Sequence, residues 1–581
     1  MSILGNYPNL EAILARTKLK YVPQEINKNS KPNRFIIAAL VFIIELAYFL
    51  IQSRWDPDPY HDGFVYAQAL AANLGYIPNR DFMALYGPIN PVIQGAWLHL
   101  IGPSLYHLRI FTALTLAITG CLIYLGTHKY YGRYFAISIS LLWVLGNPFV
   151  HNPTLPWPNI LLNLILIAGI LISRKNKFSS KLTPINLVSI SFLFTLDILI
   201  RNYALMALVM TFLAVIINST DKIKSLGYFF AGASLALGLS ALAIIKLRMW
   251  NDFYKQTVEY ALHLGADDRP LRGLINFRII MFGLLFICIL IFLKNLKNAA
   301  KSLKNRVFKI IIISILWVSI GYSGILQQDR NWNKSLSKNF FHDLHLLIEN
   351  LIYMPLYFIV FFVLVFYLLK VVKIKEFDNF SAFFQISIAV SSVFQLVPSP
   401  HIAKIWFIIP VIVIGLAPVL SESLPKKLEY LNLARKYIII PIIVTFLFIF
   451  YNQANIYRVD FKNNILAGMQ ADPKLVEVLD STLGNIEKFV INKNVEFQCV
   501  DGIYSVAGNQ YLSTTNQYVI NIPEFKEISP DTKQIFLCGV TKPFSDFYDV
   551  TRYRVLFVNQ GDETKEYNIL IEKINQNSPK N

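Results

Sequence analysis

The sequence predicts a polytopic α-helical membrane protein that ends in a small α/β domain. Of its 581 residues, 55% are hydrophobic, and the mean hydropathy is +0.46, which is typical of helices that face lipid rather than water. Long apolar runs alternate with short basic segments up to about residue 451, and the composition turns polar after it. These observations divide the chain into an N-terminal tail (1–34), a membrane domain (35–451) and a C-terminal domain (452–581).

About thirteen apolar runs are candidate membrane spans, which need roughly 20 predominantly apolar residues each. They cover residues 35–52, 105–126, 134–145, a run ending at 173, 185–200, 203–217, 226–245, 275–293, 310–326, 346–369, a run ending near 397, 402–420 and 437–451. Lys and Arg cluster before the first run and after every second run from the second to the twelfth. Because cytoplasmic loops are enriched in these residues, we expect a cytoplasmic N-terminus and an extracytoplasmic C-terminal domain in the plasma (inner) membrane.

The formal net charge of +18 would also suit a nucleic-acid-binding protein. The basic residues lie mostly between the apolar runs, however, where the enrichment of cytoplasmic loops in Lys and Arg accounts for them. We therefore expect the lipid bilayer, and no nucleic acid, as the partner of these charges.

The loop between the first two spans, residues 55–104, is rich in acids for a segment beside a membrane. Its acids are Asp56, Asp58, Asp62 and Asp81. Asp62 opens a helical pattern that ends at Gly75, and residues 92–101 form a second apolar helix that is too short to span. Treating this second helix as interfacial keeps all later basic clusters cytoplasmic. We expect a folded cap at one membrane surface, where clustered carboxylates usually mark function.

The order of residues in this cap carries a family resemblance. The run from Asp62 to Gln68 (DGFVYAQ) is followed by Arg80-Asp81-Phe82 and by Tyr86-Gly87-Pro88. This order resembles the first extracytoplasmic loop of the GT-C glycosyltransferases, in particular the aminoarabinose transferases and the bacterial enzymes similar to protein O-mannosyltransferases. The resemblance implies a GT-C fold of about thirteen spans, a polyprenyl-phosphate-linked sugar donor, and Asp62 as the catalytic base. Further loop candidates for contact with the acceptor are Asp58, Tyr66, Arg80, Asp81 and Tyr86.

Sugar transfer from a lipid phosphate also needs cations that stabilise the departing phosphate. The outward-facing candidates are His401, Lys404, Arg201 and Arg109. His401 and Lys404 lie in the segment PSPHIAKIWFIIP, which resembles the place of the family's basic residue in a late outer loop. Two alternatives stay open: Asp62 also suits the N-cap of a helix, and Arg201 can pair with Asp197, one helical turn earlier.

A metal site is left open by the sequence. Many relatives carry a second acid between the third and fourth spans, but that loop reads HNPTLPWPN here and has no carboxylate. A divalent metal would then need other ligands, for which Asp56, Asp58, Asp81 or His151 are available. Glu45, inside the first span, is expected to pack against a polar neighbour in the bundle rather than to act in catalysis.

The C-terminal domain is predicted to hold a helix over 473–489 and strands over 495–500, 517–522, 534–539 and 552–558. Cys499 and Cys538 each lie at the end of a predicted strand. An oxidising compartment would allow them to form a disulfide, and two buried free thiols are the alternative.

Two other classes of membrane protein compete with a glycosyltransferase. A transporter of lipids or polysaccharides usually has internal repeats and broken helices, which this sequence lacks. A lipid-linked glycan polymerase or ligase would have a large outer loop late in the chain, whereas the polar residues here gather in the first loop and the tail. We therefore expect transfer of a hexosyl or pentosyl group to an extracytoplasmic glycan, lipid or protein.

Overall fold

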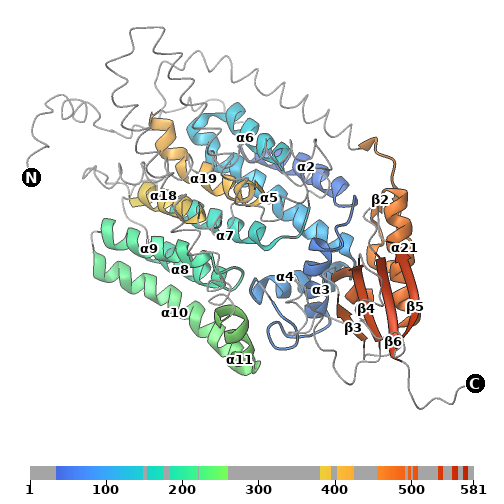
Figure 1. Ribbon diagram of the computed structural model, residues 1–581. Coiled ribbons are helices and arrows are strands. Elements are labelled where there is room, and N and C mark those ends of the chain that lie inside the picture. The colour runs from blue at the N-terminus through green and yellow to red at the C-terminus, as the bar shows by residue number, and fades with distance from the viewer. Residues whose placement is uncertain are drawn as a thin grey trace, which may run out of the picture.

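The computed structural model shows a helical bundle, a two-helix cap and an α/β tail (Figure 1). It describes residues 34–84, 86–147, 154–174, 183–219, 221–259, 380–393, 395, 402–423, 454–490, 495–498, 502–507, 534–540, 553–560 and 567–573.

The helices of the bundle agree closely with the predicted spans. They are α2 (Arg34–Gln52), α5 (Leu105–Tyr131), α6 (Arg133–Leu145), α7 (Pro158–Ser173), α8 (Pro184–Ile198), α9 (Ala204–Asn218), α10 (Lys222–Lys246), α18 (Phe380–Val393) and α19 (Ile402–Ser423), with α11 (Trp250–Phe253) and a π-helix (Tyr254–Glu259) after α10. Three of them, α2, α5 and α10, are long and apolar enough to cross a membrane by themselves, and the others are shorter apolar helices. The predicted spans 275–293, 310–326, 346–369 and 437–451 lie outside the described residues.

Local signals explain several helix ends. Gly132 separates α5 from α6 with a φ of +83°, a conformation that glycine adopts without steric cost. Ser104 caps α5 by accepting a hydrogen bond from the backbone N–H of His107. Pro158 and Pro184 begin α7 and α8, where the missing N–H of proline costs no helical hydrogen bond.

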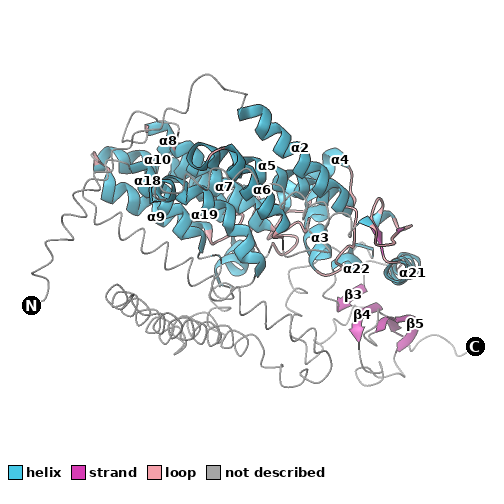
Figure 2. Ribbon diagram, turned by 90° about the horizontal axis from the view of Figure 1, so that it is seen from above, coloured by secondary structure: helices cyan, strands magenta, loops and turns pink. Residues whose placement is uncertain are grey.

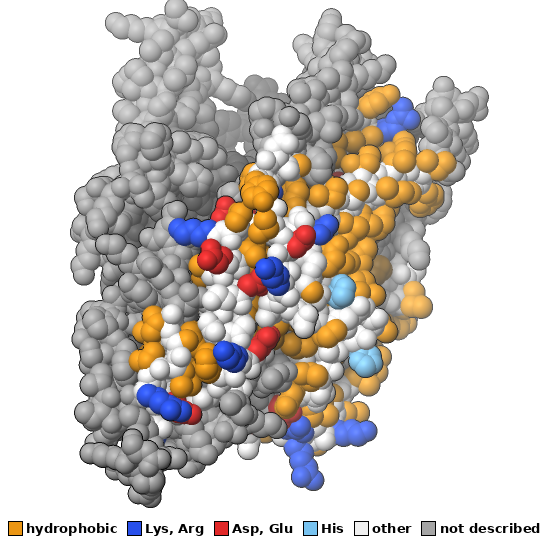
Figure 3. Space-filling view, turned by 90° about the vertical axis from the view of Figure 1, so that its right-hand side faces the viewer, with side chains coloured by type: hydrophobic (Ala, Val, Ile, Leu, Met, Phe, Trp, Pro, Cys, Tyr) orange, Lys and Arg blue, Asp and Glu red, His pale blue; other side chains and the backbone are white. Residues whose placement is uncertain are grey.

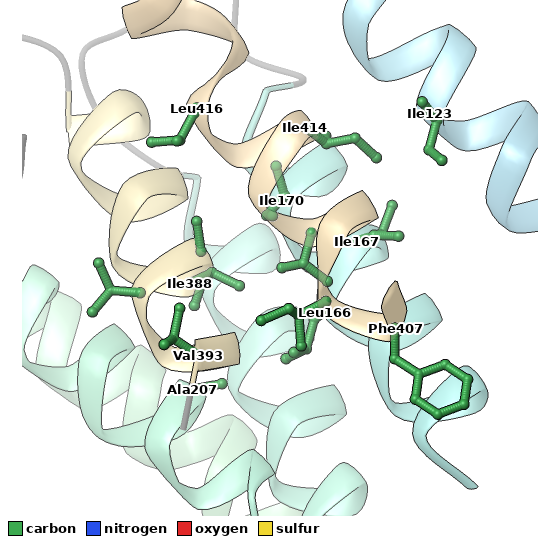
Figure 4. Close-up of a cluster of buried hydrophobic side chains, with 14 of the residues drawn as sticks. Ile123, Leu166, Ile167, Ile170, Ala207, Ile388, Val393, Phe407, Ile414 and Leu416 are labelled. Carbon is green, nitrogen blue, oxygen red and sulfur yellow. The ribbon is translucent and has the colours of Figure 1, made fainter. Parts of the chain in front are cut away.

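One hydrophobic core joins α5, α7, α9, α18 and α19. Figure 4 shows side chains of this core, with Ile123, Leu166, Ile167, Ile170, Ala207, Ile388, Val393, Phe407, Ile414 and Leu416 labelled. Beside it, the indoles of Trp143 and Trp406 stack with ring centroids 4.9 Å apart. The Nε1–H of each indole donates to the backbone carbonyl of the other tryptophan, at 3.2 and 2.7 Å, so both polar groups are satisfied inside the bundle.

The expected packing of Glu45 is confirmed. Its side chain is buried in α2, and Ser140 Oγ of α6 lies 2.6 Å from its Oε1. Gly120 of α5 leaves room for this carboxyl, since a Cβ there would lie 1.6 Å from Glu45 Oε2.

The cap consists of α3 (His61–Asn73) and α4 (Ile89–Ile101), which lie between the bundle and the tail (Figure 1). The prediction of two short helices in this loop is confirmed. Gly95 of α4 allows the two helices to touch, because a Cβ there would come within 2.8 Å of the α3 backbone at Ala69.

The tail holds a helix beside a mixed sheet, which Figure 2 shows from above. Its elements are β1 (Val459–Asp460), a 3₁₀ turn (Asn464–Leu466), β2 (Gln470–Ala471), α21 (Pro473–Phe489), β3 (Val495–Gln498), α22 (Gly502–Ala507), β4 (Gln534–Val540), β5 (Tyr553–Gln560) and β6 (Tyr567–Lys573). The sheet order is β3-β4-β6-β5, with β3 parallel to β4 and the other pairs antiparallel. The helix prediction was accurate, β6 and α22 were missed, and the predicted strand 517–522 lies outside the described residues.

The tail and the cap share one hydrophobic core. Its buried side chains come from the cap and the start of α5 (Val65, Tyr66, Leu98, Leu105, Leu108) and from the tail (Phe461, Leu466, Met469, Leu479, Leu483, Ile486). Burying these residues together removes apolar surface of both parts from water, which is the main force that holds them. The tail is therefore docked on the cap.

The surface separates apolar from charged regions. Large exposed hydrophobic side chains run along α2, among them Phe35, Leu40 and Ile44, and along α10, among them Leu235 and Leu242. In the view of Figure 3, acidic and basic side chains intermingle on the face toward the viewer, beside a broad apolar surface. Exposed apolar helix faces of this kind suit contact with lipid, as expected for a multi-pass membrane protein.

Candidate functional site

Asp62 lies in the first turn of α3 and forms an ion pair with Arg109 of α5. Both side chains are completely buried, and Asp62 Oδ2 also accepts a hydrogen bond from the backbone N–H of Asp58 at 2.8 Å. Burial raises the pKa of the Asp62 carboxyl above its ordinary value, while the positive charge of Arg109 and its hydrogen bond oppose the rise. The residue that the family resemblance singles out is thus a buried, paired carboxyl.

The alternative reading of Asp62 as a helix N-cap is wrong. The N-cap position of α3 is Tyr60, and no side chain caps it. Asp58 comes nearest to capping the start of α3, because its Oδ1 accepts hydrogen bonds from the backbone N–H groups of Tyr60 and His61 at 2.9 and 3.0 Å. The side chain of Asp62 instead points to Arg109.

Arg109 forms hydrogen bonds to the segment Trp55–Asp56, through which the chain enters the cap and which we call the cap entry. Its Nη1 donates to the backbone carbonyl of Trp55, and its Nη2 donates to that of Asp56 at 3.1 Å as well as to Asp62. Phosphate binding by Arg109 stays a prediction. The guanidinium is completely buried and directed at protein acceptors, so it positions Asp62 and the Trp55–Asp56 segment.

Asp58 and His61 form a second, more accessible pair at the start of α3. Asp58 Oδ2 lies 2.7 Å from His61 Nδ1, and the two side chains are about 35% and 42% exposed. Burial alone would raise the pKa of Asp58, but the hydrogen bonds and charge of His61 outweigh it, so this pKa lies below its ordinary value. An imidazole oriented by a carboxylate can accept a proton through its other nitrogen. The sequence analysis did not consider His61.

Aromatic rings connect this pair to the turn between α8 and α9. The ring of His61 lies 5.6 Å from that of Trp157, and Trp157 lies 5.3 Å from Tyr86. The Arg201 guanidinium stands over Tyr86, 4.4 Å from the ring centroid. Three loops that are far apart in the sequence thus meet at one place, and we refer to His61, Tyr86, Trp157 and Arg201 as the aromatic wall.

Gly87 brings the cap against the α8–α9 turn. Its φ is +137°, and a Cβ on it would lie 2.1 Å from the backbone oxygen of Leu199. The neighbouring Ile89 N–H donates to the same oxygen at 3.3 Å. The Tyr86-Gly87-Pro88 motif therefore needs glycine for a close backbone approach, and this approach carries Tyr86 to Arg201.

The alternative role of Arg201, a pairing with Asp197, is not seen. Their backbones share a helical hydrogen bond, from Arg201 N–H to the Asp197 carbonyl at 2.9 Å, but no ion pair joins the two side chains. The guanidinium instead contacts the rings of Tyr86 and Tyr203.

Three of the loop candidates are engaged in structural contacts. Arg80 and Asp81 pair with each other at 2.8 Å, and Arg80 Nη1 also donates to the carbonyl of Leu247, after α10, at 3.4 Å. The hydrogen bond from Arg80 holds the pKa of Asp81 below its ordinary value. Tyr66 is buried, and its hydroxyl donates to the carbonyl of Pro103 at 2.8 Å. Tyr66 thus lies in the core that the cap and the tail share, and its contact with the acceptor stays a prediction.

The tail contributes directly to the cap entry. Arg458 pairs with Asp56 at 2.9 Å and lies over the Trp55 ring, 4.5 Å from its centroid. Asp56 N–H donates to the Gln470 carbonyl at 2.8 Å, and Asp56 has a φ of +44°, which is uncommon outside glycine. The tail therefore fixes Asp56, whose backbone carbonyl accepts a hydrogen bond from Arg109.

A buried amide cluster lies next to Trp157 in the sequence. Asn159 Nδ2 donates to Gln395 Oε1 at 2.9 Å, and Gln395 Nε2 donates to Asn163 Oδ1 at 2.7 Å. Neither this cluster nor Trp157 was predicted from the sequence as part of a site. Asn at the i and i+4 positions of an apolar helix was the available signal.

Several predicted residues cannot be placed. His401, Cys499 and His151 lie outside the described residues, and the side chains of Lys404 and Cys538 are also outside them. The disulfide stays a prediction.

Among the residues that the structure describes, no group of three His, Cys, Asp or Glu side chains has the arrangement of a metal site. Asp56, Asp58 and Asp62 are directed to Arg458, His61 and Arg109 respectively, which does not suit a shared cation. We therefore derive no step through a metal.

Comparisons with known proteins were made at three levels. No protein-family model matches the sequence, and no curated protein is significantly similar to it. Among solved structures, ArnT from Cupriavidus metallidurans bound to undecaprenyl phosphate has a TM-score of 0.42 and 10% identity, over 94% of this chain and 98% of that one. The apo state of the same protein has a TM-score of 0.40 and 11% identity, over 93% and 98%.

The archaeal oligosaccharyltransferase AglB from Archaeoglobus fulgidus, in complex with an inhibitory peptide and a dolichol-phosphate, has a TM-score of 0.43 and 12% identity, over 86% of this chain and 69% of that one. Likenesses with TM-scores below 0.5 lend no weight to a function. The aligned regions cover most of this chain, at identities of 10 to 12%.

Proposed function

We propose that this protein transfers a sugar from a polyprenyl-phosphate-linked donor to an extracytoplasmic acceptor. The observation that carries the proposal is the convergence of the acidic cap entry with the aromatic wall, at one end of the helical bundle. This place offers carboxylates for a proton, a cation for a phosphate and aromatic surface for a sugar. We propose that a lipid donor reaches it from the bilayer and an acceptor from water.

The reaction is a substitution at the anomeric carbon of the sugar. The acceptor hydroxyl oxygen forms a bond to this carbon, and the bond to the phosphate oxygen breaks with its electron pair staying on the phosphate. The hydroxyl proton passes to a base on the protein. The products are the glycosylated acceptor and the polyprenyl phosphate, whose charge Arg201 would stabilise from its place on the aromatic wall. His401 and Lys404 stay candidates for the same task.

Asp62 is our first candidate for the base, from the family resemblance. Its carboxylate is completely buried. It contacts the half-exposed Asp58–His61 pair, because Asp62 Oδ2 accepts the hydrogen bond from Asp58 N–H. An acceptor hydroxyl would meet His61 before it meets Asp62 in this arrangement. His61, oriented by Asp58, is therefore the second candidate for the base.

Substitution by an uncharged amide side chain distinguishes Asp62 from His61 as the base. Asp62→Asn should lower the transfer rate by about 10² to 10⁴-fold if Asp62 takes the proton. His61→Gln should have that effect instead if the Asp58–His61 pair takes it. The variant with the larger loss of kcat at unchanged donor affinity identifies the base.

The function itself is tested with purified protein in vesicles that contain a labelled undecaprenyl-phosphate-linked sugar. We expect the label to move to an acceptor, with release of undecaprenyl phosphate. Movement of the intact donor across the vesicle membrane would identify a transporter, and growth of a repeating glycan would identify a polymerase.

A further inference from the structure

Asp197 and Arg201 are buried at the α8–α9 turn, and polar atoms of both side chains lack a hydrogen-bond partner among the residues that the structure describes. Asp197 is 0% exposed and Arg201 is 7% exposed. Within the described part of the chain, neither carboxylate oxygen of Asp197 has a hydrogen-bond partner, and neither has Nη1 of Arg201. Buried polar groups are nearly always hydrogen-bonded, since an unpaired one loses its interaction with water and gains nothing.

The two residues are also in a position to satisfy each other, yet they do not. Arg201 N–H donates to the Asp197 carbonyl at 2.9 Å, which is the spacing of one helical turn and places both residues on one face. An Asp and an Arg at this spacing are near enough to form an ion pair. Arg201 instead turns to the rings of Tyr86 and Tyr203, 4.4 and 5.1 Å from its guanidinium carbon. Nη1 of Arg201, on the aromatic wall, and both carboxylate oxygens of Asp197, four residues earlier, are thus without hydrogen bonds in the described part of the chain.

The chemistry of the two groups defines what they can bind. A carboxylate only accepts hydrogen bonds, so its ligand must donate them, whereas a guanidinium only donates and needs an acceptor. A phosphate alone would satisfy Arg201 but would be repelled by Asp197. A glycosyl phosphate satisfies both, because its sugar hydroxyls donate and its phosphate oxygens accept. The aromatic rings beside Arg201 provide apolar surface, as in most small-ligand sites.

We propose that Asp197 and Arg201 form the subsite for the glycosyl phosphate of the donor. The Asp197 carboxylate accepts hydrogen bonds from hydroxyls of the sugar, and Arg201 Nη1 donates to an oxygen of the phosphate that joins the sugar to the lipid. Asp197 then decides which sugar is accepted, and Arg201 binds any lipid phosphate. This inference rests on the proposed function, since it names the part of the site that recognises the donor.

The test compares lipids with and without a sugar. Wild-type protein and three variants, Asp197→Asn, Arg201→Gln and Glu45→Gln, are placed in nanodiscs. Binding is measured for bare undecaprenyl phosphate and for a panel of undecaprenyl-phosphate-linked hexoses and pentoses. Glu45→Gln is the matched control, because it also removes a buried carboxyl from the bundle but one that contacts Ser140. Thermal unfolding of each variant reports whether it folds.

We expect Asp197→Asn to weaken binding of the preferred sugar-bearing lipid about tenfold or more and to leave bare undecaprenyl phosphate within about twofold. Arg201→Gln should weaken both lipids, and Glu45→Gln should weaken neither. The inference is overturned if Asp197→Asn changes neither lipid or changes both alike, if Glu45→Gln has the same effect, or if the wild type prefers bare undecaprenyl phosphate to every sugar-bearing lipid.

A second measurement avoids the variants. Donors that lack single sugar hydroxyls are bound to the wild-type protein, and at least one should bind about tenfold more weakly. Equal binding of all deoxy donors would contradict a carboxylate that reads hydroxyls. The proposed function can fail while the subsite holds, and the reverse. Sugar-selective binding without any transfer would refute the glycosyltransferase and leave the subsite in place. Sugar transfer that Asp197→Asn leaves intact would refute only the subsite.

Discussion

Asp62 and Arg109 form a charge pair whose members depend on each other. Both are completely buried, so each charge is stabilised mainly by the other and by the backbone groups of residues 55–58. Breaking a buried pair on one side leaves an uncompensated charge, whereas removing both charges is often nearly neutral. Stability and chemistry at Asp62 can therefore be separated by a double substitution.

We predict that Arg109→Met lowers the free energy of unfolding by about 3–5 kcal/mol, because the Asp62 carboxylate stays buried without its cation. The double variant Asp62→Asn/Arg109→Met should regain most of that stability. Its transfer rate should stay about 10² to 10⁴-fold below the wild type if Asp62 is the base. Thermal unfolding and transfer assays on the same preparations check both points, and a double variant with normal transfer would exclude Asp62 as the base.

The pH dependence offers an independent check at the same residue. Burial raises the pKa of Asp62, so as the pH falls through this raised pKa the carboxylate is protonated and a base is lost. The ordinary pKa of Asp is about 4. The acid limb of kcat/KM should therefore lie at a higher pH than that value. Because the folded pKa is the higher one, protonation of this group favours the folded state, and the activity should fall without unfolding. An acid limb that Asp62→Asn leaves unchanged would assign it to another group.

At the scale of elements, the close approach of the cap to the α8–α9 turn organises the site. Tyr86, Trp157 and Arg201 come from three different connections between helices, and they meet because Gly87 allows its backbone to touch Leu199. The helices themselves only bring these connections to the same end of the bundle (Figure 1).

We predict that Gly87→Ala weakens donor binding and lowers stability, because the added Cβ would lie 2.1 Å from the Leu199 oxygen and force the cap away from Arg201. Gly75→Ala is the matched control. It also places alanine at a positive φ, +90°, but meets nothing within 4 Å, so it should cost only about 1–2 kcal/mol of backbone strain. Binding of undecaprenyl phosphate and thermal unfolding are measured for both, and equal effects of the two variants would contradict the role of the contact.

At the scale of the whole molecule, the tail belongs to the candidate site through the cap. Arg458 and Gln470 hold Asp56, the carbonyl of Asp56 accepts from Arg109, and Arg109 pairs with Asp62. The shared hydrophobic core keeps these contacts in place.

We predict that Arg458→Ala lowers kcat about tenfold or more while donor affinity changes little, since the change displaces Asp56 and not Arg201. Arg54→Ala is the control, because it removes another contact between cap and tail, the exposed pair with Asp460 at 3.4 Å. An exposed pair contributes about 0–1 kcal/mol, so this variant should transfer sugar at nearly the normal rate. Transfer rates and donor affinities are compared side by side, and equal losses in both variants would show that general loosening of the tail, not Arg458, is responsible.

The sequence by itself determined the helical elements and the position of the cap. Apolar length, basic clusters and end signals such as Gly132, Ser104 and Pro158 are local features, and the described helices follow them within a few residues. Helix α21 was predicted at its observed bounds, whereas β6 was missed although its run Ile569–Ile571 is apolar and strand-like. The fold class and the acidic loop as the candidate site could be predicted for the same reason.

Only the tertiary structure decided which charges meet. Asp62 pairs with Arg109, 47 residues away, and Asp56 pairs with Arg458, 402 residues away. Asp197 forms no ion pair with Arg201, which lies only four residues further along the chain and contacts the rings of Tyr86 and Tyr203 instead. Periodicity shows which residues share a helix face, but the partner of a buried charge depends on which helices and loops pack together. That packing is set by the shared hydrophobic cores and by close approaches such as that of Gly87 to Leu199, which no local pattern in the sequence specifies.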